Sequence, residues 1–125
     1  MIRVFIVDDH PVVIEGIHSL LQHEKDIAWV GQAMNAASCL GFFVNNTADV
    51  VLMDISMPGM DGVEATAALL AAYPEAAVIG LTASANLRER QALSDAGAVD
   101  CLSKDGELDQ IVAAIHRAVG TTPAE

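Results

Sequence analysis

An aspartate stands at an unusual place in this sequence, directly after the apolar run 50–53 and before the loop sequence SMPGMDG. Four successive apolar side chains predict a strand that is buried on both faces. An ionisable side chain at the end of such a strand, here Asp54, is costly unless water, a cation or hydrogen-bond donors meet it. The chemistry of this chain is therefore expected where Asp54 emerges from the sheet.

Four further residues with charged or hydroxyl side chains end other apolar runs. Asp8 and Asp9 follow the first run, and Thr82 and Lys104 lie at the ends of the fourth and fifth. If the first and third strands are neighbours in a parallel sheet, three carboxylates meet at one edge. Carboxylates this close must take up a proton or bind a cation. Oxygen ligands favour a hard ion, so we predict Mg²⁺ at Asp8, Asp9 and Asp54.

A divalent cation beside a carboxylate and a lysine suits phosphoryl transfer, in which catalysis is mostly positioning and charge neutralisation. A carboxylate can itself be the nucleophile and carry the group as an aspartyl phosphate. We predict this role for Asp54.

The elements that must position these residues alternate between strand-like and helical patterns. The predicted strands cover residues 2–7, 27–33, 49–53, 77–83 and 98–104. The predicted helices are one that begins at Pro11 and others over 36–46, 63–73, 86–96 and 107–119. Strict alternation predicts an α/β fold, with a parallel five-stranded sheet and helices on both faces.

Local signals mark several helix boundaries. The start signals are the capping-box pairs Asp61 with Glu64 and Asn86 with Glu89, and the capping residue Asp105. Gly97 and Gly120 stand where the fourth and fifth helices should end in a left-handed cap.

Composition limits the function classes. The 125 residues are 53% hydrophobic, which predicts one domain with an ordered core. No apolar run approaches the roughly 20 residues of a membrane span, and we expect a cytoplasmic protein. A net charge of -11 disfavours direct binding to nucleic acid or to an anionic membrane. Cys39 and Cys101 are too few for a disulfide framework and are interpreted as two buried thiols.

Four motifs occur in a specific order along the chain: VDDHP at 7–11, MDISMPGMDG at 53–62, LTA at 81–83 and SKD at 103–105. With these motifs, residues 2–119 resemble the receiver domain of bacterial two-component response regulators. The sequence DDHPVVIEG and the Lys-Asp pair resemble the NarL/FixJ branch, whose members usually carry a LuxR-type helix-turn-helix DNA-binding domain. The resemblance implies a flavodoxin-like fold with strand order 2-1-3-4-5.

The resemblance also implies a role for each site residue. Asp54 would accept a phosphoryl group from a histidine kinase or a small acyl phosphate. Asp9 would bind Mg²⁺ directly, Asp8 would act partly through water, and Ser56 would supply a backbone carbonyl. Thr82 would hydrogen-bond a phosphoryl oxygen.

Lys104 would pair with the phosphate, and two positions near it depart from the family pattern. Cys101 stands three residues earlier, where many receivers have an aromatic residue that swings inward on activation. Asp105 follows the lysine where proline is common, so a trans peptide bond is expected there.

For the whole molecule, we expect a receiver domain at 1–119 and the start of a linker or tail at 120–125. Its expected partners are a sensor histidine kinase and, after phosphorylation, a second copy of the chain. DNA would be reached only through an output domain that is not part of this sequence. The alternative is a stand-alone or phosphorylation-independent receiver that acts as an interaction module.

Two enzyme or cofactor classes are less consistent with the sequence. A haloacid dehalogenase-type phosphatase needs a second aspartate two residues after the nucleophile, where this chain has Ser56. A flavin-binding domain would need a Ser/Thr/Gly-rich phosphate loop where this chain has DDHP. No turnover of external substrates is therefore expected. His10 is interpreted as a helix-entry residue that could also shape access to the site.

Overall fold

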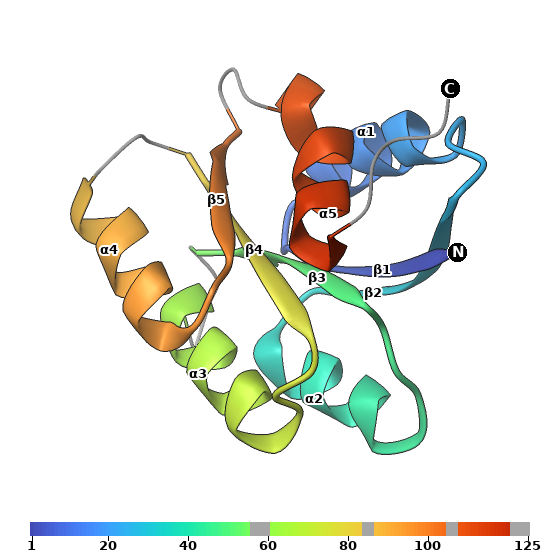
Figure 1. The fold of residues 1–125 in the computed structure, drawn as a ribbon. Helices are drawn as coiled ribbons and strands as arrows, with labels where there is room; N and C mark the ends of the chain where they lie inside the picture. Colours follow the sequence, from blue (N-terminus) through green and yellow to red (C-terminus); the bar gives the residue numbers. More distant parts are fainter. Residues whose placement is uncertain (56–60, 84–86, 105–107, 121–125) are drawn as a thin grey trace.

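The computed structural model describes residues 1–55, 61–83, 87–104 and 108–120. Within these ranges, five parallel strands form one sheet in the order β2-β1-β3-β4-β5 (Figure 1). They are β1 (Ile2–Val7), β2 (Ile27–Ala33), β3 (Val50–Asp54), β4 (Ala77–Thr82) and β5 (Asp100–Ser103). This order confirms the flavodoxin-like arrangement.

Helices cover both faces of the sheet. Helices α1 (Pro11–Leu21) and α5 (Ile111–Val119) lie on one face, and α2 (Ala36–Asn45), α3 (Gly62–Ala72) and α4 (Leu87–Ala96) on the other (Figure 1). Successive side chains of a strand point to opposite faces, so each inner strand must supply apolar residues to two cores. In β3, Leu52 joins the core under α1 and α5, while Met53 joins the core under α2 and α3.

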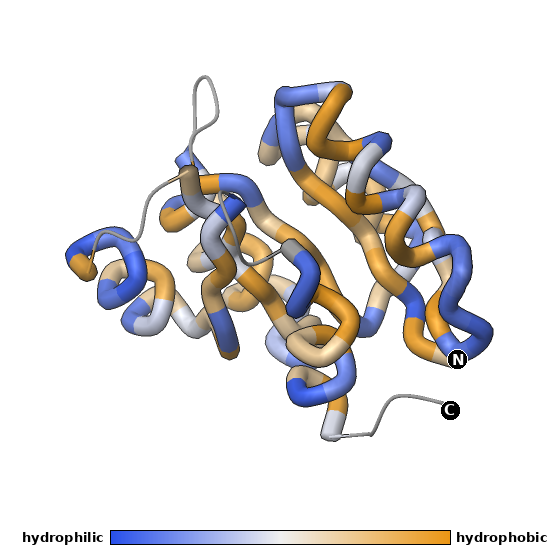
Figure 2. Tube along the Cα trace, turned by 90° about the horizontal axis from the view of Figure 1, so that it is seen from above, coloured by the Kyte–Doolittle hydropathy of each residue, from blue (hydrophilic) through white to orange (hydrophobic). Residues whose placement is uncertain are grey.

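The distribution of hydropathy follows from these two cores. Figure 2 shows hydrophobic residues along the strands and hydrophilic residues on outward-facing turns. All five residues of β3 are buried, which confirms the prediction of a strand with no solvated face. No helix in the described ranges is both long and apolar enough to cross a membrane.

Most element boundaries agree with the prediction within two residues, and two differences have a physical cause. The last helix does not begin at 107: a 3-10 turn (Leu108–Gln110) precedes α5, which begins at Ile111. Strand β5 is shorter than the predicted 98–104 and begins only at Asp100. Its start is delayed because residues 97 and 98 close α4: Gly97 has a φ of 110°, and the amide of Ala98 donates to the carbonyl of Leu93.

The capping predictions are partly tested. Asp61 caps α3, since its Oδ1 accepts a hydrogen bond from the amide of Glu64 at 2.9 Å. Gly120 ends α5 in the left-handed conformation, as predicted. The other two capping residues, Asn86 and Asp105, lie outside the described ranges.

The interpretation of two buried thiols is correct for one cysteine only. Cys39 lies on the buried face of α2, and burial raises the pKa of its thiol to about 12, so it stays protonated at neutral pH. Cys101 is only partly buried, because β5 is an edge strand of the sheet. The interpretation was wrong for Cys101.

Candidate functional site at the carboxyl edge of the sheet

Strand register brings the predicted carboxylates together. In the pairing of β1 with β3, Val7 lies beside Met53, so the next residues of the two strands, Asp8 and Asp54, emerge side by side. On the other side of β3, Asp54 pairs with Leu81 of β4. The sequence predicted this meeting only on the condition that β1 and β3 are neighbours, and the sheet satisfies that condition.

Lys104 joins the two buried carboxylates. Its Nζ lies 2.8 Å from Oδ2 of Asp8 and 3.0 Å from Oδ1 of Asp54. The side chains of these aspartates are 0% and 3% exposed, so both charges depend on close partners. Burial by itself lowers the pKa of Lys104, but the hydrogen bonds to Asp8 and Asp54 outweigh it and hold the pKa above its ordinary value.

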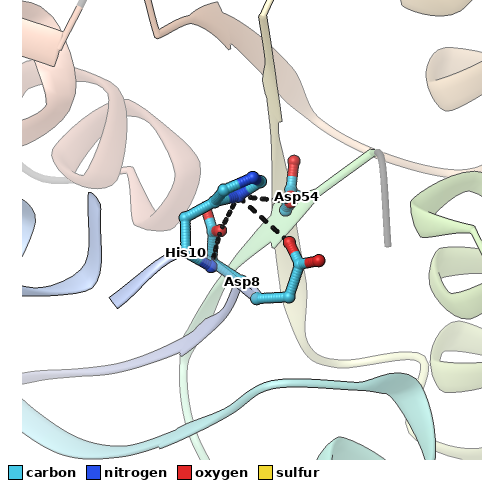
Figure 3. Close-up of side chains that lie close together, drawn as sticks. Asp8, His10 and Asp54 are labelled. Carbon is cyan, nitrogen blue, oxygen red and sulfur yellow. Dashed lines mark hydrogen bonds and ion pairs between the residues drawn. The ribbon is translucent and has the colours of Figure 1, made fainter. Parts of the chain in front are cut away.

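The ring of His10 lies over the same carboxylates (Figure 3). Its Nδ1 is 2.8 Å from Oδ1 of Asp8, 3.0 Å from Oδ1 of Asp9 and 3.7 Å from Oδ2 of Asp54. The hydrogen bond to Asp8 and the charge of Asp9 raise the pKa of His10 above its ordinary value of 6.5. His10 also precedes α1 as its N-cap residue, so the helix-entry interpretation holds. The sequence had also suggested that His10 could shape access to the site, but it did not predict direct contacts with the carboxylates.

The cluster has the composition of a divalent-cation site. One ligand atom from each of Asp8, Asp9, His10 and Asp54 lies within 4.8 Å of the others. A single ammonium, that of Lys104, cannot neutralise three carboxylates that are this close together. Oxygen donors with an unbalanced negative charge fit a hard cation that keeps part of its water shell. The carbonyl predicted at Ser56 lies outside the described ranges.

Replacing His10 with alanine is expected to tighten Mg²⁺ binding severalfold, because the ring contacts oxygen atoms that the cation would use. Isothermal titration calorimetry measures the change. His23→Ala is the matched control, since His23 is exposed on the turn after α1. Weaker binding by His10→Ala would instead make His10 a ligand.

Thr82 ends β4 beside the cluster and is 2% exposed. Its hydroxyl donates a hydrogen bond to Oε2 of Glu89, in the first turn of α4, at 2.8 Å. Strand pairing places Thr82 beside Ser103, and the amide of Lys104 donates to the carbonyl of Thr82 at 2.7 Å. Lys104 and Thr82 are thus held by the same strand pair. Nothing in the sequence pattern pointed to Glu89 beyond its role in a capping box.

The start of α3 packs directly against the backbone at the end of β3, where Asp54 stands. The amide of Gly62 donates to the carbonyl of Ile55 at 2.7 Å, and the hydroxyl of Thr66 donates to the carbonyl of Gly62 at 2.7 Å. A Cβ at Gly62 would lie 2.2 Å from the backbone oxygen of Asp54. Only glycine allows this approach of the helix to the end of β3.

A hollow of about 600 Å³ lies at the opposite edge of the sheet. Arg3 and Tyr73 line it, and the guanidinium of Arg3 is already bound to Asp49 at 3.1 Å. The buried carboxylates of Asp8 and Asp54, and the ammonium that contacts both, are at the carboxyl edge, so we place the functional site there.

The fold and this acidic edge define a class of proteins, the receiver domains. The response regulator receiver domain family matches residues 4–116, and the chain belongs to this family. It is 38% identical over 117 residues to the response regulator GacA of Pseudomonas aeruginosa, covering 94% of this chain and 55% of GacA. The chain therefore spans about half the length of the curated relatives it matches.

Two solved structures place the chain more narrowly. A LuxR-family response regulator from Aurantimonas has a TM-score of 0.90 and 28% identity, with 98% of this chain and 88% of that chain covered. The receiver domain of the putative response regulator NarL from Mycobacterium tuberculosis has a TM-score of 0.86 and 32% identity, with 95% and 97% covered. With GacA, they place this receiver domain in the NarL/FixJ branch.

Proposed function

We propose that this receiver domain accepts a phosphoryl group on Asp54 and uses the modification to switch the surface around α4. The observation that supports this most is the contact of Lys104 with both Asp8 and Asp54, in a pair of buried carboxylates at the carboxyl edge of the sheet. A buried carboxylate with an ammonium at 3.0 Å and a candidate cation site beside it is suited to phosphoryl transfer.

In the proposed reaction, a carboxylate oxygen of Asp54 forms a bond to phosphorus as the phosphorus–nitrogen bond of a kinase phosphohistidine breaks. The released imidazole keeps the electron pair of that bond. Lys104 pairs with a phosphoryl oxygen, and Asp8 then loses part of its contact with the ammonium. The hydroxyl of Thr82 donates a hydrogen bond to another phosphoryl oxygen.

Mg²⁺ bound by Asp8, Asp9 and Asp54, with the carbonyl of Ser56, would neutralise charge on the phosphoryl oxygens. The role of this chain's own residues is to hold that charge pattern in place before the donor arrives. Hydrolysis of the aspartyl phosphate resets the domain, and no external substrate is turned over in this proposal.

The output is proposed to be transcription. Residues 1–119 would be the receiver, and residues 120–125 would begin a linker to a helix-turn-helix domain, as suggested by the length of the curated relatives. The phosphorylated form would associate with a second copy, and DNA would be bound through the output domain alone. The acidic charge of -11 agrees with that division of roles.

Replacing Asp54 with asparagine is expected to abolish phosphorylation, because an amide cannot supply the attacking oxygen. Intact-mass spectrometry after incubation with acetyl phosphate and Mg²⁺ measures this. The wild type should gain a single phosphoryl adduct, and EDTA should prevent it. An adduct retained in Asp54→Asn would place the acceptor elsewhere, and no adduct in folded wild type, even with a kinase, would favour a phosphorylation-independent module.

A further inference from the structure

The hydrogen bond between Thr82 and Glu89 has a consequence for activation. A threonine hydroxyl carries one proton, so it cannot donate to Glu89 and to a phosphoryl oxygen at the same time. In this structure the hydroxyl of Thr82 donates to Oε2 of Glu89 at 2.8 Å. We propose that Glu89 is a positioning residue that competes with the phosphoryl group for the Thr82 hydroxyl and so favours the resting state. This inference rests on the function proposed for Asp54.

The interaction is strong enough to matter. A hydroxyl that donates to a carboxylate forms a charge-assisted bond, which is stronger than a bond between neutral groups. Thr82 is almost fully buried and Glu89 is partly buried, so competition from water for the bond is reduced. Because the bond exists in the resting arrangement only, its whole strength shifts the equilibrium between the two states.

The bond also links the site to the surface of α4. Glu89 lies in the first turn of the helix, two residues after Leu87, which is 80% exposed. Arg90, the next residue of the helix, is bound to β5 separately, since its Nη1 donates to the carbonyl of Cys101 at 2.9 Å. When Thr82 turns to the phosphoryl group, the helix loses its contact with β4 at Glu89 and keeps the contact at Arg90. The start of α4, from Leu87 to Glu89, is therefore the part that responds.

The test is the affinity for beryllofluoride, a phosphoryl analogue that binds an aspartate carboxylate in the presence of Mg²⁺. Amide NMR titrations of ¹⁵N-labelled protein give the dissociation constant. Glu89→Ala is expected to bind beryllofluoride about five- to tenfold more tightly than the wild type, because the competing acceptor is gone. Glu89→Gln keeps a weaker acceptor and should fall between the two.

A double-mutant cycle separates this role from a general effect of charge. Thr82→Ala removes the shared proton, so adding Glu89→Ala to it should leave the affinity unchanged. If Glu89→Ala tightens binding equally with and without Thr82, or if Glu89→Gln matches Glu89→Ala, the loss of negative charge is the cause and the proposal is wrong. Unchanged affinity in Glu89→Ala would also overturn it.

The controls distinguish the two proposals. Glu89 is a partly exposed helical residue, and alanine favours helix, so thermal unfolding should show folded variants. Asp54→Asn must abolish beryllofluoride binding. If the wild type does not bind, the function proposed for Asp54 fails, and this inference fails with it. If the wild type binds through Asp54 but Glu89→Ala does not differ, only the competition by Glu89 is refuted.

Discussion

Replacing Lys104 with methionine is expected to lower the free energy of unfolding by about 3 kcal/mol in the absence of divalent cations. The ammonium lies 2.8 Å from Asp8 and 3.0 Å from Asp54, whose side chains are buried. Methionine fills a similar volume but leaves two carboxylates side by side without that cation. The expected loss is at the lower end for a broken buried pair, because Lys104 is partly exposed and His10 remains near the carboxylates.

Urea unfolding at pH 7 measures this loss. The pKa of Lys104 is raised, so its stabilising contribution is fully present below the ordinary lysine value of 10.5 and is lost as the pH rises through the raised value. At pH 7 the whole contribution is therefore measured. Adding Mg²⁺ should recover part of the stability of Lys104→Met, because a cation at the carboxylates replaces the lost charge.

The matched control is Lys25→Met, which removes the same charge from an exposed lysine. It should change the unfolding free energy by no more than about 0.5 kcal/mol. Phosphorylation of Lys104→Met by acetyl phosphate should also be slow. Equal stability of Lys104→Met and wild type without Mg²⁺ would show that Asp8 and Asp54 do not depend on the ammonium.

Replacing Gly62 with alanine is expected to destabilise the protein by about 2–3 kcal/mol. The new Cβ would lie 2.2 Å from the oxygen of Asp54 and 2.6 Å from Cα of Ile55. Both neighbours are backbone atoms, which cannot rotate away, so α3 must move from the end of β3. Because Asp54 is the proposed acceptor, phosphorylation should slow as well.

The chain contains matched controls for this change. Gly41 in α2 and Gly16 in α1 have no atoms within 4 Å of the position that a Cβ would take. Alanine at either position should stabilise the protein by roughly 0.5–1 kcal/mol, since glycine is costly inside a helix. Urea unfolding of the three variants compares them directly. A Gly62→Ala variant as stable as the controls would contradict the close approach of α3 to β3.

Several parts of the fold could be predicted because they depend on local patterns. The side chains of residues 50–53 point alternately into the two cores on either face of the sheet. All four must therefore be apolar, and this is visible in the sequence. Asp61 caps α3 through an amide three residues away, so its spacing to Glu64 was sufficient. Boundaries were less certain where the backbone changes conformation. The 3-10 turn before α5 was missed, whereas the end of α4 at Gly97 was predicted from the glycine.

The sequence by itself determined the types of element, their alternation and the strand ends at which Asp8, Asp54 and Lys104 stand. These follow from periodicity and from the rule that the carboxyl ends of parallel strands share an edge. The tertiary structure decided which side chains meet there. Two contacts depend on strand register and helix packing: that of His10 with the carboxylates, and the hydrogen bond from the Thr82 hydroxyl to Glu89. Contacts between separate elements are determined by the packing of the whole domain. These two contacts therefore leave no periodic signal in the sequence.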